Sequence, residues 1–359
     1  MTSGNVSTTF PSDDPVTVAL MNEPHDGVSW DQYALGHPAA TGYHTLAWRH
    51  VIGKVFGHQT YYLMAKNAGG DVRGILPLVY TKSPMFGRFF TSVAFVNYGG
   101  VLADHETARC ALLQAAAETA RSVGASHIEL RQEQPIGTNW PLRSHKVSMR
   151  LPLPPDHAVL MKSYPSKLRS QIRRAQKEGM VVKIGGGELL NDYYAVFSRC
   201  MRDLGTPVYA REFFRVIGET FSKEVRFCVV SLEGTPLAAG LLYGFRQRLE
   251  IPWAASDKRY SRLAPNMLLY SAVLEFACRE GYTEFDFGRS SINSGTYRFK
   301  QQWGAQPHPL YWYYWVADGR NVPQLNPDNP KYGAAIAVWQ RLPLPVANLV
   351  GPHIVKYLP

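Results

Sequence analysis

The chain contains an internal repeat, which constrains the fold more than any other feature of the sequence. Residues 112–131 and 268–288 share one layout: an amphipathic helix, a glycine and a short strand. When Gly124 is aligned with Gly281, the apolar positions of the two helices coincide at i, i+3, i+4 and i+8. A helix buries such a face against a sheet, and both glycines suit the left-handed position that follows a helix.

The similarity extends upstream of the two helices. Residues 61–80 and 225–245 each read as a strand, a glycine-containing turn and a second strand, a pattern typical of a hairpin. The sequence therefore predicts a duplicated α/β unit. The proline-rich segment 150–157 interrupts regular structure between the copies, and we place the domain boundary there. The predicted parts are a first domain at 1–150, a second domain at 151–318, and a segment at 319–359 that is not a third copy and packs back on the first domain or lies at a surface.

Composition restricts the partners. The chain has 359 residues, which suits two domains of ordinary size. Its formal net charge is +10, which favours polyanionic partners such as nucleic acid, nucleotide-linked substrates or an anionic membrane face. We expect a phosphorylated or polyanionic substrate, with tRNA among the options and DNA not among them.

Cysteine spacing and hydropathy restrict the setting. The four cysteines stand far apart without metal-ligand spacing, so we expect reduced core residues, no disulfide framework and no metal site. The N-terminus lacks a signal-peptide pattern, and no apolar run has the length of a membrane span. We expect a soluble cytoplasmic protein. Residues 335–359 combine apolar and basic side chains without an acid, which leaves open a peripheral contact with the inner face of the membrane; packing against the first domain is the alternative that we favour.

A basic helix is predicted over residues 165–179. Leu168, Ile172 and Ala175 form its apolar stripe, Ser166 is the expected cap, and Gly179 ends it. Five cations occupy the other faces: Lys167, Arg169, Arg173, Arg174 and Lys177. They form either a solvated face paired with carboxylates elsewhere or a phosphate-binding surface. We expect the phosphate-binding surface to lie beside the cleft between the repeats, with Lys167, Arg169, Arg173 and Arg174 as substrate-binding candidates.

The chain resembles the FemAB-like branch of the GNAT (Gcn5-related N-acetyltransferase) superfamily, and more narrowly the FemAB-related proteins of exosortase/PEP-CTERM and exopolysaccharide systems. The similar segments are the basic helix and residues 43–58, 74–90, 96–102 and 285–314. The resemblance implies two tandem GNAT domains, each a mixed, mainly antiparallel sheet flanked by helices. It also implies transfer of an activated acyl or aminoacyl group to an amine, with binding in the cleft between the domains.

The resemblance leaves the donor open between aminoacyl-tRNA and acyl-CoA, and it requires no cofactor. Enzymes of the superfamily that use acetyl-CoA carry a glycine-rich loop before the helix, whose backbone N–H groups bind the pyrophosphate. Residues 260–269 lack a glycine at this position, and Pro265 removes a donor. In the first domain Asp104 and Glu106 would repel phosphate. Both observations favour a donor other than acyl-CoA.

Three candidates for catalysis lie close together in the sequence. Strand alternation over 284–288 places Asp286 opposite two phenylalanines, near a strand end at Gly288, where it could accept a proton from the amine. Neutralisation by Arg289 is the alternative. In the following short helix, Tyr297 and Lys300 share one side. The resemblance aligns Lys300 with the lysine of the Fem-type F-K-x-x-[F/W]-G motif, near the donor or the developing oxyanion.

Further candidates for substrate binding are weaker. Asn97 and Tyr98 precede paired glycines, which let a ligand approach the backbone or form a bulge. Trp253 precedes a group of cations just ahead of the predicted helix that begins near residue 268. Aromatic and cationic side chains together suit the stacking of nucleic-acid bases, and a position in the core is equally consistent. Arg289 is the remaining candidate.

The sequence supports three functions. The first is an N-acyl or N-aminoacyl transferase of cell-envelope or exopolysaccharide biosynthesis. The second is an acyl-CoA-dependent N-acetyltransferase of an amino sugar or nucleotide sugar. The third is a non-catalytic assembly factor that binds a polyanion and accounts for the charge without chemistry. The proximity of Asp286, Tyr297 and Lys300 favours an enzyme.

Overall fold

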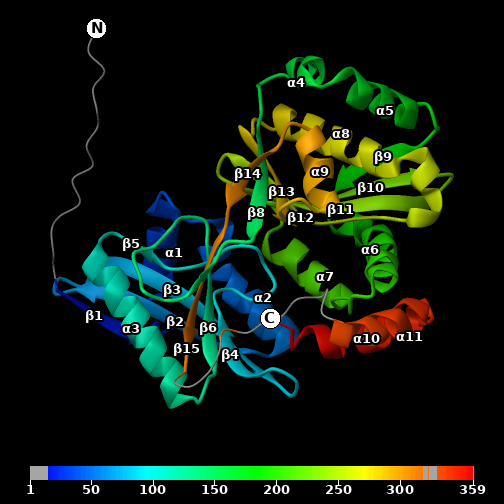
Figure 1. The fold of residues 1–359 in the computed structure, drawn as a ribbon. Coiled ribbons are helices and arrows are strands. Elements are labelled where there is room, and N and C mark those ends of the chain that lie inside the picture. Colours follow the sequence, from blue (N-terminus) through cyan, green and yellow to red (C-terminus); the bar gives the residue numbers. More distant parts are fainter. Residues whose placement is uncertain (1–14, 318–321, 323–329, 359) are drawn as a thin grey trace, which may run out of the picture.

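The computed structural model describes residues 15–317, 322 and 330–358, and shows two sheets flanked by helices (Figure 1). The first sheet has the order β1-β2-β3-β4-β6-β15-β7, with β5 paired to β3. Its strands are β1 (Val16–Leu20), β2 (Gln59–Asn67), β3 (Val72–Ser83), β4 (Gly87–Thr91), β5 (Leu102–Ala103), β6 (His127–Gln132), β7 (Leu142–Arg143) and β15 (Tyr311–Val316). The helices of this domain are α1 (Gly27–Gly36), the 3-10 turn η1 (Gly42–His44), α2 (Ala47–Phe56) and α3 (Glu106–Ser122).

The second sheet has the order β14-β8-β13-β12-β11-β10-β9. Its strands are β8 (Lys146–Pro152), β9 (Val181–Gly185), β10 (Val225–Leu232), β11 (Thr235–Phe245), β12 (Arg248–Ser256), β13 (Glu284–Ser291) and β14 (Gln306–Pro309). Its helices are α4 (His157–Ser163), α5 (Ser166–Gln176), η2 (Gly187–Leu189), α6 (Leu190–Leu204), α7 (Arg211–Thr220), η3 (Lys258–Leu263), α8 (Pro265–Arg279) and α9 (Gly295–Gln302). Both sheets are mixed and mainly antiparallel, so the predicted fold class is confirmed.

The repeat predicted from the sequence is present in the structure. Helix α3 leads into β6 as α8 leads into β13, and the hairpins β2–β3 and β10–β11 precede them. Gly124 and Gly281 follow the helices with φ of 67° and 80°, the left-handed conformation that glycine adopts without penalty. The apolar faces that matched in the sequence are the faces that the two helices bury against their sheets.

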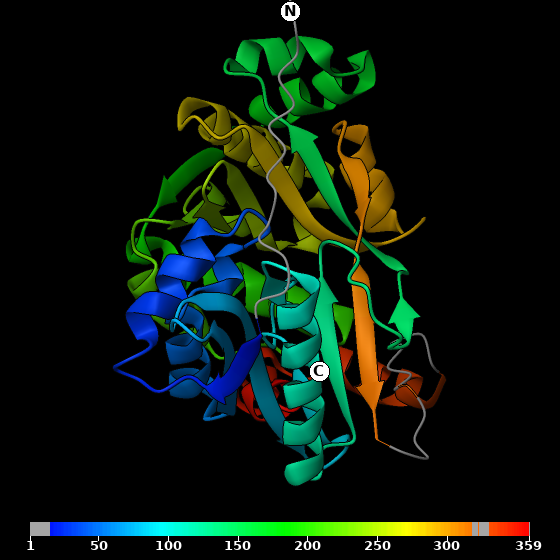
Figure 2. The ribbon, with the colours of Figure 1, turned by 90° about the vertical axis from the view of Figure 1, so that its left-hand side faces the viewer.

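Two strands lie in the sheet of the domain that is not their neighbour in the sequence. Strand β8 follows the first domain in sequence but lies in the second sheet between β14 and β13, whereas β15 follows the second domain and lies in the first sheet between β6 and β7. Figure 2 shows β15 running from the second domain down alongside the first sheet. The boundary predicted at residue 150 therefore falls inside β8, and 311–316 of the predicted second domain belong to the first sheet.

The two domains share one apolar core. Tyr43 and Trp48 of the first domain pack in the same cluster as Phe213, Phe214 and Tyr243 of the second, and the Trp48 and Phe221 rings lie 5.1 Å apart. Helix α2 also packs directly against α7. Because this interface is apolar and buried, the residues at the junction are held in fixed relative positions.

The C-terminal segment packs on the second domain rather than chiefly on the first. Helices α10 (Pro330–Arg341) and α11 (Leu344–Val355) both contact α6 (Figure 1). Among the described residues, two hydrogen-bond contacts reach the first domain: the Nε2 atom of His58 lies 2.8 Å from the carbonyl oxygen of Lys356, and Arg143 of β7 donates to the carbonyl oxygen of Val322 at 3.4 Å. Residues 319–321, 323–329 and 359 of this predicted segment lie outside the described residues. Within the part of the chain that the structure describes, no helix is both long and apolar enough to cross a bilayer.

The cysteines conform only in part to the expected reduced core. Cys228 and Cys278 are buried, Cys200 is half-buried, and Cys110 is exposed on α3. All four are free thiols. The expectation was wrong for Cys110, which lies on the solvent side of an amphipathic helix.

Candidate active site at the domain junction

The second sheet changes its pairing where β12 meets β13. The two strands pair in parallel at three positions, which end with Glu250 opposite Asp286. Beyond this point β13 forms a bulge on its other side, between Asp286 and Arg289, with Gly288 at φ 76°. The strand then continues to Ser291, so the prediction that it ends at Gly288 was wrong. A bulge breaks the ladder and redirects the side chains that follow.

Asp286 is the centre of the hydrogen-bond network at this junction. Its carboxylate accepts hydrogen bonds from the Tyr98 hydroxyl at 2.6 Å, the Ser148 hydroxyl at 2.7 Å and the Gly288 backbone N–H at 2.8 Å. The side chain is fully buried, and the Arg150 Nε lies 3.6 Å away. Because its oxygens are occupied and shielded from solvent, Asp286 is suited to holding the two domains in register rather than to receiving a proton from a substrate.

Lys300 extends from α9 to the same bulge. Its ammonium donates to the carbonyl oxygens of Gly288 at 2.9 Å and Arg289 at 3.0 Å. Burial lowers the pKa of Lys300 to about 8, so the group remains mostly protonated at neutral pH. A lysine ammonium has three donors, and these two carbonyls use two of them. The third can point to a ligand as a desolvated positive charge.

Glu250 is a buried carboxyl group that the sequence analysis did not select. It accepts hydrogen bonds from the Tyr43 hydroxyl and the Asn97 amide, each at 2.7 Å. Burial, followed by the nearby charge of Asp286, raises the pKa of Glu250 to about 8. The signal was present in the sequence, because a single acid between Leu249 and Ile251 in an apolar strand indicates a buried carboxyl group.

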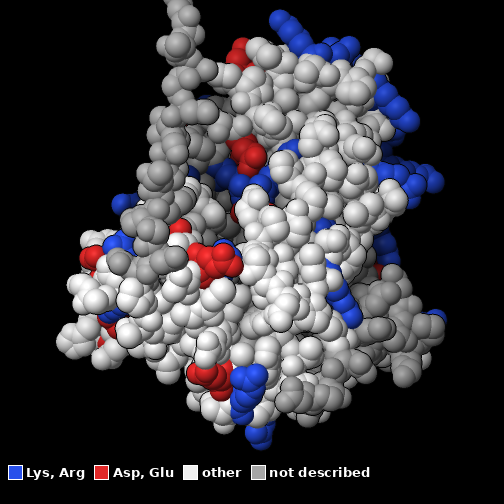
Figure 3. Space-filling view, turned by 60° about the vertical axis from the view of Figure 1, so that its left-hand side comes forward, with Lys and Arg blue, Asp and Glu red and all other residues white. Residues whose placement is uncertain are grey.

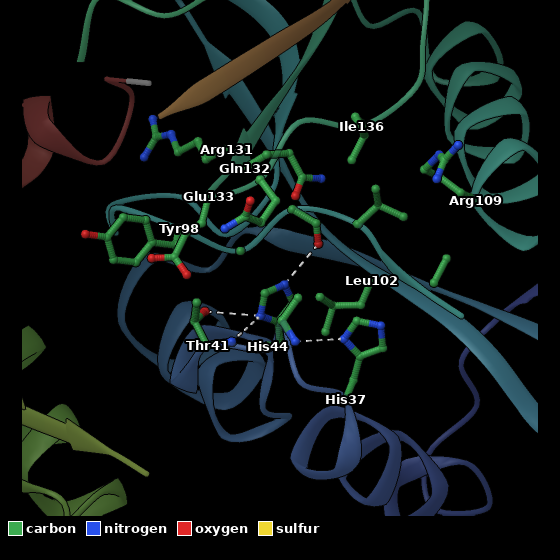
Figure 4. Close-up of a pocket in the computed structure, with 16 residues that line it drawn as sticks. His37, Thr41, His44, Tyr98, Leu102, Arg109, Arg131, Gln132, Glu133 and Ile136 are labelled. Atoms are coloured by element: carbon green, nitrogen blue, oxygen red, sulfur yellow. Dashed lines mark hydrogen bonds between the residues drawn. The ribbon is translucent and has the colours of Figure 1, made fainter. Parts of the chain in front are cut away.

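Two cavities meet at Tyr98 and Thr41, which line both. The larger has a volume of about 330 Å³ and lies between the domains, where Tyr43, Arg248 and Glu250 form part of its wall. The smaller, of about 140 Å³, lies in the first domain (Figure 4). Figure 3 shows acidic and basic side chains together in the hollow between the upper and lower parts of the molecule. The junction therefore offers adjoining spaces for two substrates.

An ion-pair network joins the two cavities, since Arg248 and Glu284 line the larger one and Glu133 lines the smaller one. Glu133 of the first domain pairs with Arg150 and with Arg248, the latter at 2.9 Å, and Arg248 also pairs with Glu284 at 2.6 Å. None of these residues was selected from the sequence, because charged residues at such spacing give no local pattern. Networks of this kind fix geometry when their members satisfy one another.

His44 in the smaller cavity is a structural residue. Its Nδ1 accepts a hydrogen bond from the Thr41 backbone N–H at 3.0 Å, so the proton lies on Nε2, which faces the Gly100 carbonyl oxygen at 3.1 Å. Burial lowers the pKa of His44 to about 4. A neutral imidazole with both nitrogens engaged is not available for proton transfer at neutral pH.

The structure brings some of the predicted residues together. Asn97 and Tyr98 reach from the first domain to Glu250 and Asp286. Lys300 meets the bulge that carries Asp286. These segments, which lie far apart in the sequence, therefore form one site at the junction.

Other predicted residues have different surroundings. Tyr297 is half-buried and packs on the core of the second domain beside α9. Trp253 packs in an aromatic cluster, with its ring 5.4 Å from that of Phe213, so its surroundings are those of a core residue. Arg289 does not neutralise Asp286; it lies over the Trp312 ring instead.

The basic helix lies away from this junction. Helix α5 packs on α8 at the far side of the second domain from the first domain (Figure 1), so its expected place beside the cleft was wrong. Leu168, Ile172 and Ala175 are buried as predicted, but Ser166 is the first helical residue and makes no cap hydrogen bond. The helix was misplaced because sequence gives the face that a helix buries and not the element that receives it.

The cations of α5 divide into two groups. Arg169 donates to the carbonyl oxygens of Lys162 and Tyr164, and Arg174 donates to that of Arg262 in η3, just before α8. Lys167, Arg173 and Lys177 are exposed, and their side chains make no hydrogen bond or ion pair to another described residue. These three form a solvent-facing basic surface.

Comparisons with known proteins agree with this architecture. Residues 162–301 match the family model described as an acetyltransferase (GNAT) domain. A search of curated proteins finds no match. The crystal structure of FemX is similar, with a TM-score of 0.63 and 15% identity over 84% of this chain and 98% of that chain.

Two further solved structures have the same architecture. A tandem GNAT protein from the clavulanic acid biosynthesis pathway has a TM-score of 0.55 and 12% identity over 86% of this chain and 100% of that chain. The C-terminal domain of a putative lysylphosphatidylglycerol synthetase from Agrobacterium fabrum has a TM-score of 0.54 and 12% identity over 81% of this chain and 92% of that chain. At these identities the likeness concerns the fold.

Proposed function

We propose that the chain is a GNAT acyltransferase of FemX-like tandem fold, and that it transfers an activated acyl or aminoacyl group to an amine acceptor at the domain junction. The observation that carries the proposal is the bulge of β13, where a desolvated lysine, Lys300, lies in the domain that matches the acetyltransferase family. The amine nitrogen forms a bond to the acyl carbon, the bond from that carbon to the donor's oxygen or sulfur breaks, and the amine loses a proton.

Lys300 has the properties that this reaction requires of an electrophilic group. Two of its N–H groups are fixed by the carbonyl oxygens of Gly288 and Arg289, so the ammonium cannot reorient when charge develops on the substrate. Donors that are fixed in advance and removed from water stabilise an oxyanion far better than mobile ones. Lys300 is accordingly our candidate for stabilising the carbonyl oxygen of the tetrahedral intermediate.

Glu250 is our candidate for receiving the proton of the amine. It lines the larger cavity, and with a raised pKa of about 8 its ionised form, which accepts the proton, increases as pH rises toward 8. Matching of the base to the working pH favours general-base catalysis. Tyr43 and Asn97 hold the carboxyl group in one orientation, and Asp286 acts as a positioning residue for the network around it.

For the donor, we favour aminoacyl-tRNA, and for the pathway, cell-envelope or exopolysaccharide assembly. The loop before α8 supports the choice of donor. Ala264 adopts φ 54° and Pro265 is the first residue of the helix. Arg174 donates a hydrogen bond to the carbonyl oxygen of Arg262. This loop has no glycine and fewer backbone donors for a pyrophosphate. The basic surface of Lys167, Arg173 and Lys177 nearby suits a nucleic-acid backbone. The FemAB resemblance supports the pathway.

Acyl-CoA-dependent acetyl transfer to an amino sugar or nucleotide sugar is the second candidate. The specific observation in its favour is that the matching family model is described as an acetyltransferase domain. A non-catalytic assembly factor is the least favoured function, because burial of the Lys300 ammonium is costly and, among the described residues, the ammonium contacts two backbone carbonyl oxygens and forms no ion pair with a carboxylate.

The test measures binding and transfer with both donors. Purified protein is titrated with charged tRNA and with acetyl-CoA at two salt concentrations, and amide formation on a panel of amines is followed by mass spectrometry. We expect saturable tRNA binding that weakens steeply with salt, and amide products that disappear in Lys300→Met. Saturable binding and turnover with acetyl-CoA alone would replace the first candidate by the second, and absence of product with both donors would favour the assembly factor.

A matched pair of triple variants tests the basic surface. We expect Lys167→Gln/Arg173→Gln/Lys177→Gln to weaken tRNA binding and to reduce its salt slope by about three, one for each lost phosphate contact. The control removes three exposed cations elsewhere: Lys82→Gln/Lys223→Gln/Arg279→Gln. Equal effects of the two triples would show that net charge, and not this surface, governs binding.

A further inference from the structure

Arg289 has a guanidinium group without a polar partner in the part of the chain that the structure describes. It follows the bulge of β13, and its side chain is exposed to solvent. Within the described ranges this side chain has no hydrogen bond or ion pair, and its Cζ lies over the Trp312 ring, 4.9 Å from the ring centroid. Because the side chain reaches solvent and makes no hydrogen bond or ion pair to another described residue, its N–H donors are available to a ligand.

Stacking on Trp312 holds the guanidinium in a way that suits ligand binding. A planar guanidinium stacked on an indole uses its face for the cation–π contact and leaves its N–H groups directed outward in the plane. Those donors match the spacing of two oxygens of a carboxylate or phosphate. Trp312 is itself held in place, because it is buried and pairs with Arg131 of β6 and with Arg143 of β7.

The face of the first sheet around Trp312 has an excess of positive charge. Arg131, Trp312 and Arg143 are direct partners on three adjacent strands, so their side chains lie on one face of the sheet. Arg131 also lies over the Trp312 ring, with its Cζ 5.0 Å from the centroid. The carboxylate of this face, Glu129, is already engaged by the Arg131 Nε at 2.7 Å and the Tyr314 hydroxyl at 2.8 Å. Arg289 therefore adds a positive charge to a face whose acid is occupied.

Electrostatics agrees with this geometry. Burial, followed by the nearby charge of Arg131, lowers the pKa of Arg289 to about 10, even though the side chain reaches solvent. The exposed His145 near the same Trp312 ring also has a lowered pKa, because of desolvation and then the charges of Lys146, Arg143 and Arg289. In both cases the neighbouring cations add to the effect of desolvation, and a bound anion would offset their repulsion.

We propose that Arg289, held on Trp312, binds an anionic group of the substrate, a phosphate or a carboxylate, beside the reaction centre. The backbone carbonyl of Arg289 accepts a hydrogen bond from Lys300, so one peptide segment presents both the anion-binding side chain and the anchor of the electrophilic ammonium. The substrate thus carries a negative group close to its reacting atoms. This use of the site rests on the proposed function, whereas anion binding by Arg289 does not.

The test measures anion binding directly. Wild type, Arg289→Met, Arg289→Lys and the control Arg279→Gln are titrated by calorimetry with inorganic phosphate and pyrophosphate in one series and with malonate in the other. Arg279 is exposed, pairs with Glu280 and lies on α8 away from this face. We expect the preferred anion to bind wild type and Arg279→Gln equally, at least tenfold more weakly to Arg289→Met, and with intermediate affinity to Arg289→Lys, which keeps the charge and loses the paired donors.

The series that binds identifies the ligand. Preference for pyrophosphate indicates a phosphorylated substrate, and preference for malonate indicates a carboxylate. As an independent readout, phenylglyoxal modification followed by peptide mapping is expected to label Arg289 in the free protein and to be suppressed by the preferred anion. Failure of both series to bind, or equal affinity of Arg289→Met and wild type, overturns the site. Either result leaves the transferase assay free to succeed or fail separately.

Discussion

The two copies of the repeat have a carboxylate at equivalent positions, but its hydrogen-bond and charge partners differ between them. The alignment of Gly124 with Gly281 also pairs Glu129 with Asp286, and each is the last residue of a three-residue parallel pairing. In the first copy, burial alone would raise the pKa of Glu129, but the charge and hydrogen bond of Arg131 outweigh it and lower the pKa. In the second copy, Asp286 is held by two hydroxyls and a backbone N–H.

The difference shows which copy of the repeat keeps charged groups that are available for a reaction. The position of Arg131 in the first copy corresponds to Gly288 in the second, so the second copy has no arginine at this point. Its local charge balance is instead divided among Glu250, Lys300 and Arg150, two of which have pKa values near 8. The first copy forms a closed ion pair, whereas the second keeps groups that can exchange protons or contact a ligand.

The largest effect is expected where the closed pair is broken. Arg131→Met leaves Glu129 buried without its charge partner, so we expect the free energy of unfolding to fall by about 3–5 kcal/mol, measured by urea denaturation. The double variant Glu129→Gln/Arg131→Met, which removes both charges, should be less destabilised than the single variant. If Arg131→Met lost under about 1 kcal/mol, well below the cost of an unpaired buried charge, the first copy would not be a closed ion pair.

Lys300 tests the copy that retains chemistry. We expect Lys300→Met to lower kcat by about 100- to 1000-fold, the range for loss of one oxyanion donor, with a smaller change in KM. Circular dichroism and thermal unfolding verify that the variant is folded. Full turnover by folded Lys300→Met would remove the residue from the mechanism. The charged groups of the second copy would then have no more evidence of a catalytic role than the Glu129–Arg131 pair of the first.

The pH dependence of stability tests Glu250. The folded state keeps a proton on Glu250 up to a pKa of about 8, whereas the ordinary pKa of a glutamate is 4.5, so the contribution of Glu250 is full below pH 4.5 and is lost as pH rises to 8. Glu250→Gln removes this loss, so the variant should gain about 1–3 kcal/mol relative to wild type between pH 5 and pH 8. Chemical denaturation at both pH values measures the gain, and parallel pH profiles of the two proteins would show that Glu250 is ionised throughout.

Gly288 gives the smallest of the four effects. Its φ is 76°, and the Ile251 carbonyl oxygen lies 3.4 Å from the position that a Cβ methyl group would occupy. Gly288→Ala should therefore cost about 1–2 kcal/mol, the penalty for a left-handed non-glycine residue. Gly295→Ala is the matched control, because open space surrounds its Cβ position. Equal melting temperatures of the two variants would show that the bulge tolerates a side chain.

The sequence contained the repeat, the helix and strand order, and the core face of each repeated helix, because these depend on local periodicity. It also contained the neighbourhood of Asp286, Lys300, Asn97 and Tyr98, since the resemblance and the glycine pattern marked those segments. The sequence did not predict which residue each of these side chains contacts. Glu250 contacts Tyr43 and Asn97 of the other domain, and Trp312 pairs with Arg131 and Arg143, which are distant in the sequence but lie in the same sheet. No local pattern encodes such long-range contacts.

The position of β15 between β6 and β7 has a consequence for biosynthesis. The ribosome delivers both neighbours of this strand by residue 143 but does not deliver the strand itself until residue 316. The first sheet therefore lacks β15 while the whole second domain is translated, and it becomes complete only when most of the chain has been synthesised. A truncated product that ends between the domains would expose two unpaired strand edges, which makes it a target for chaperones and proteases rather than a functional half.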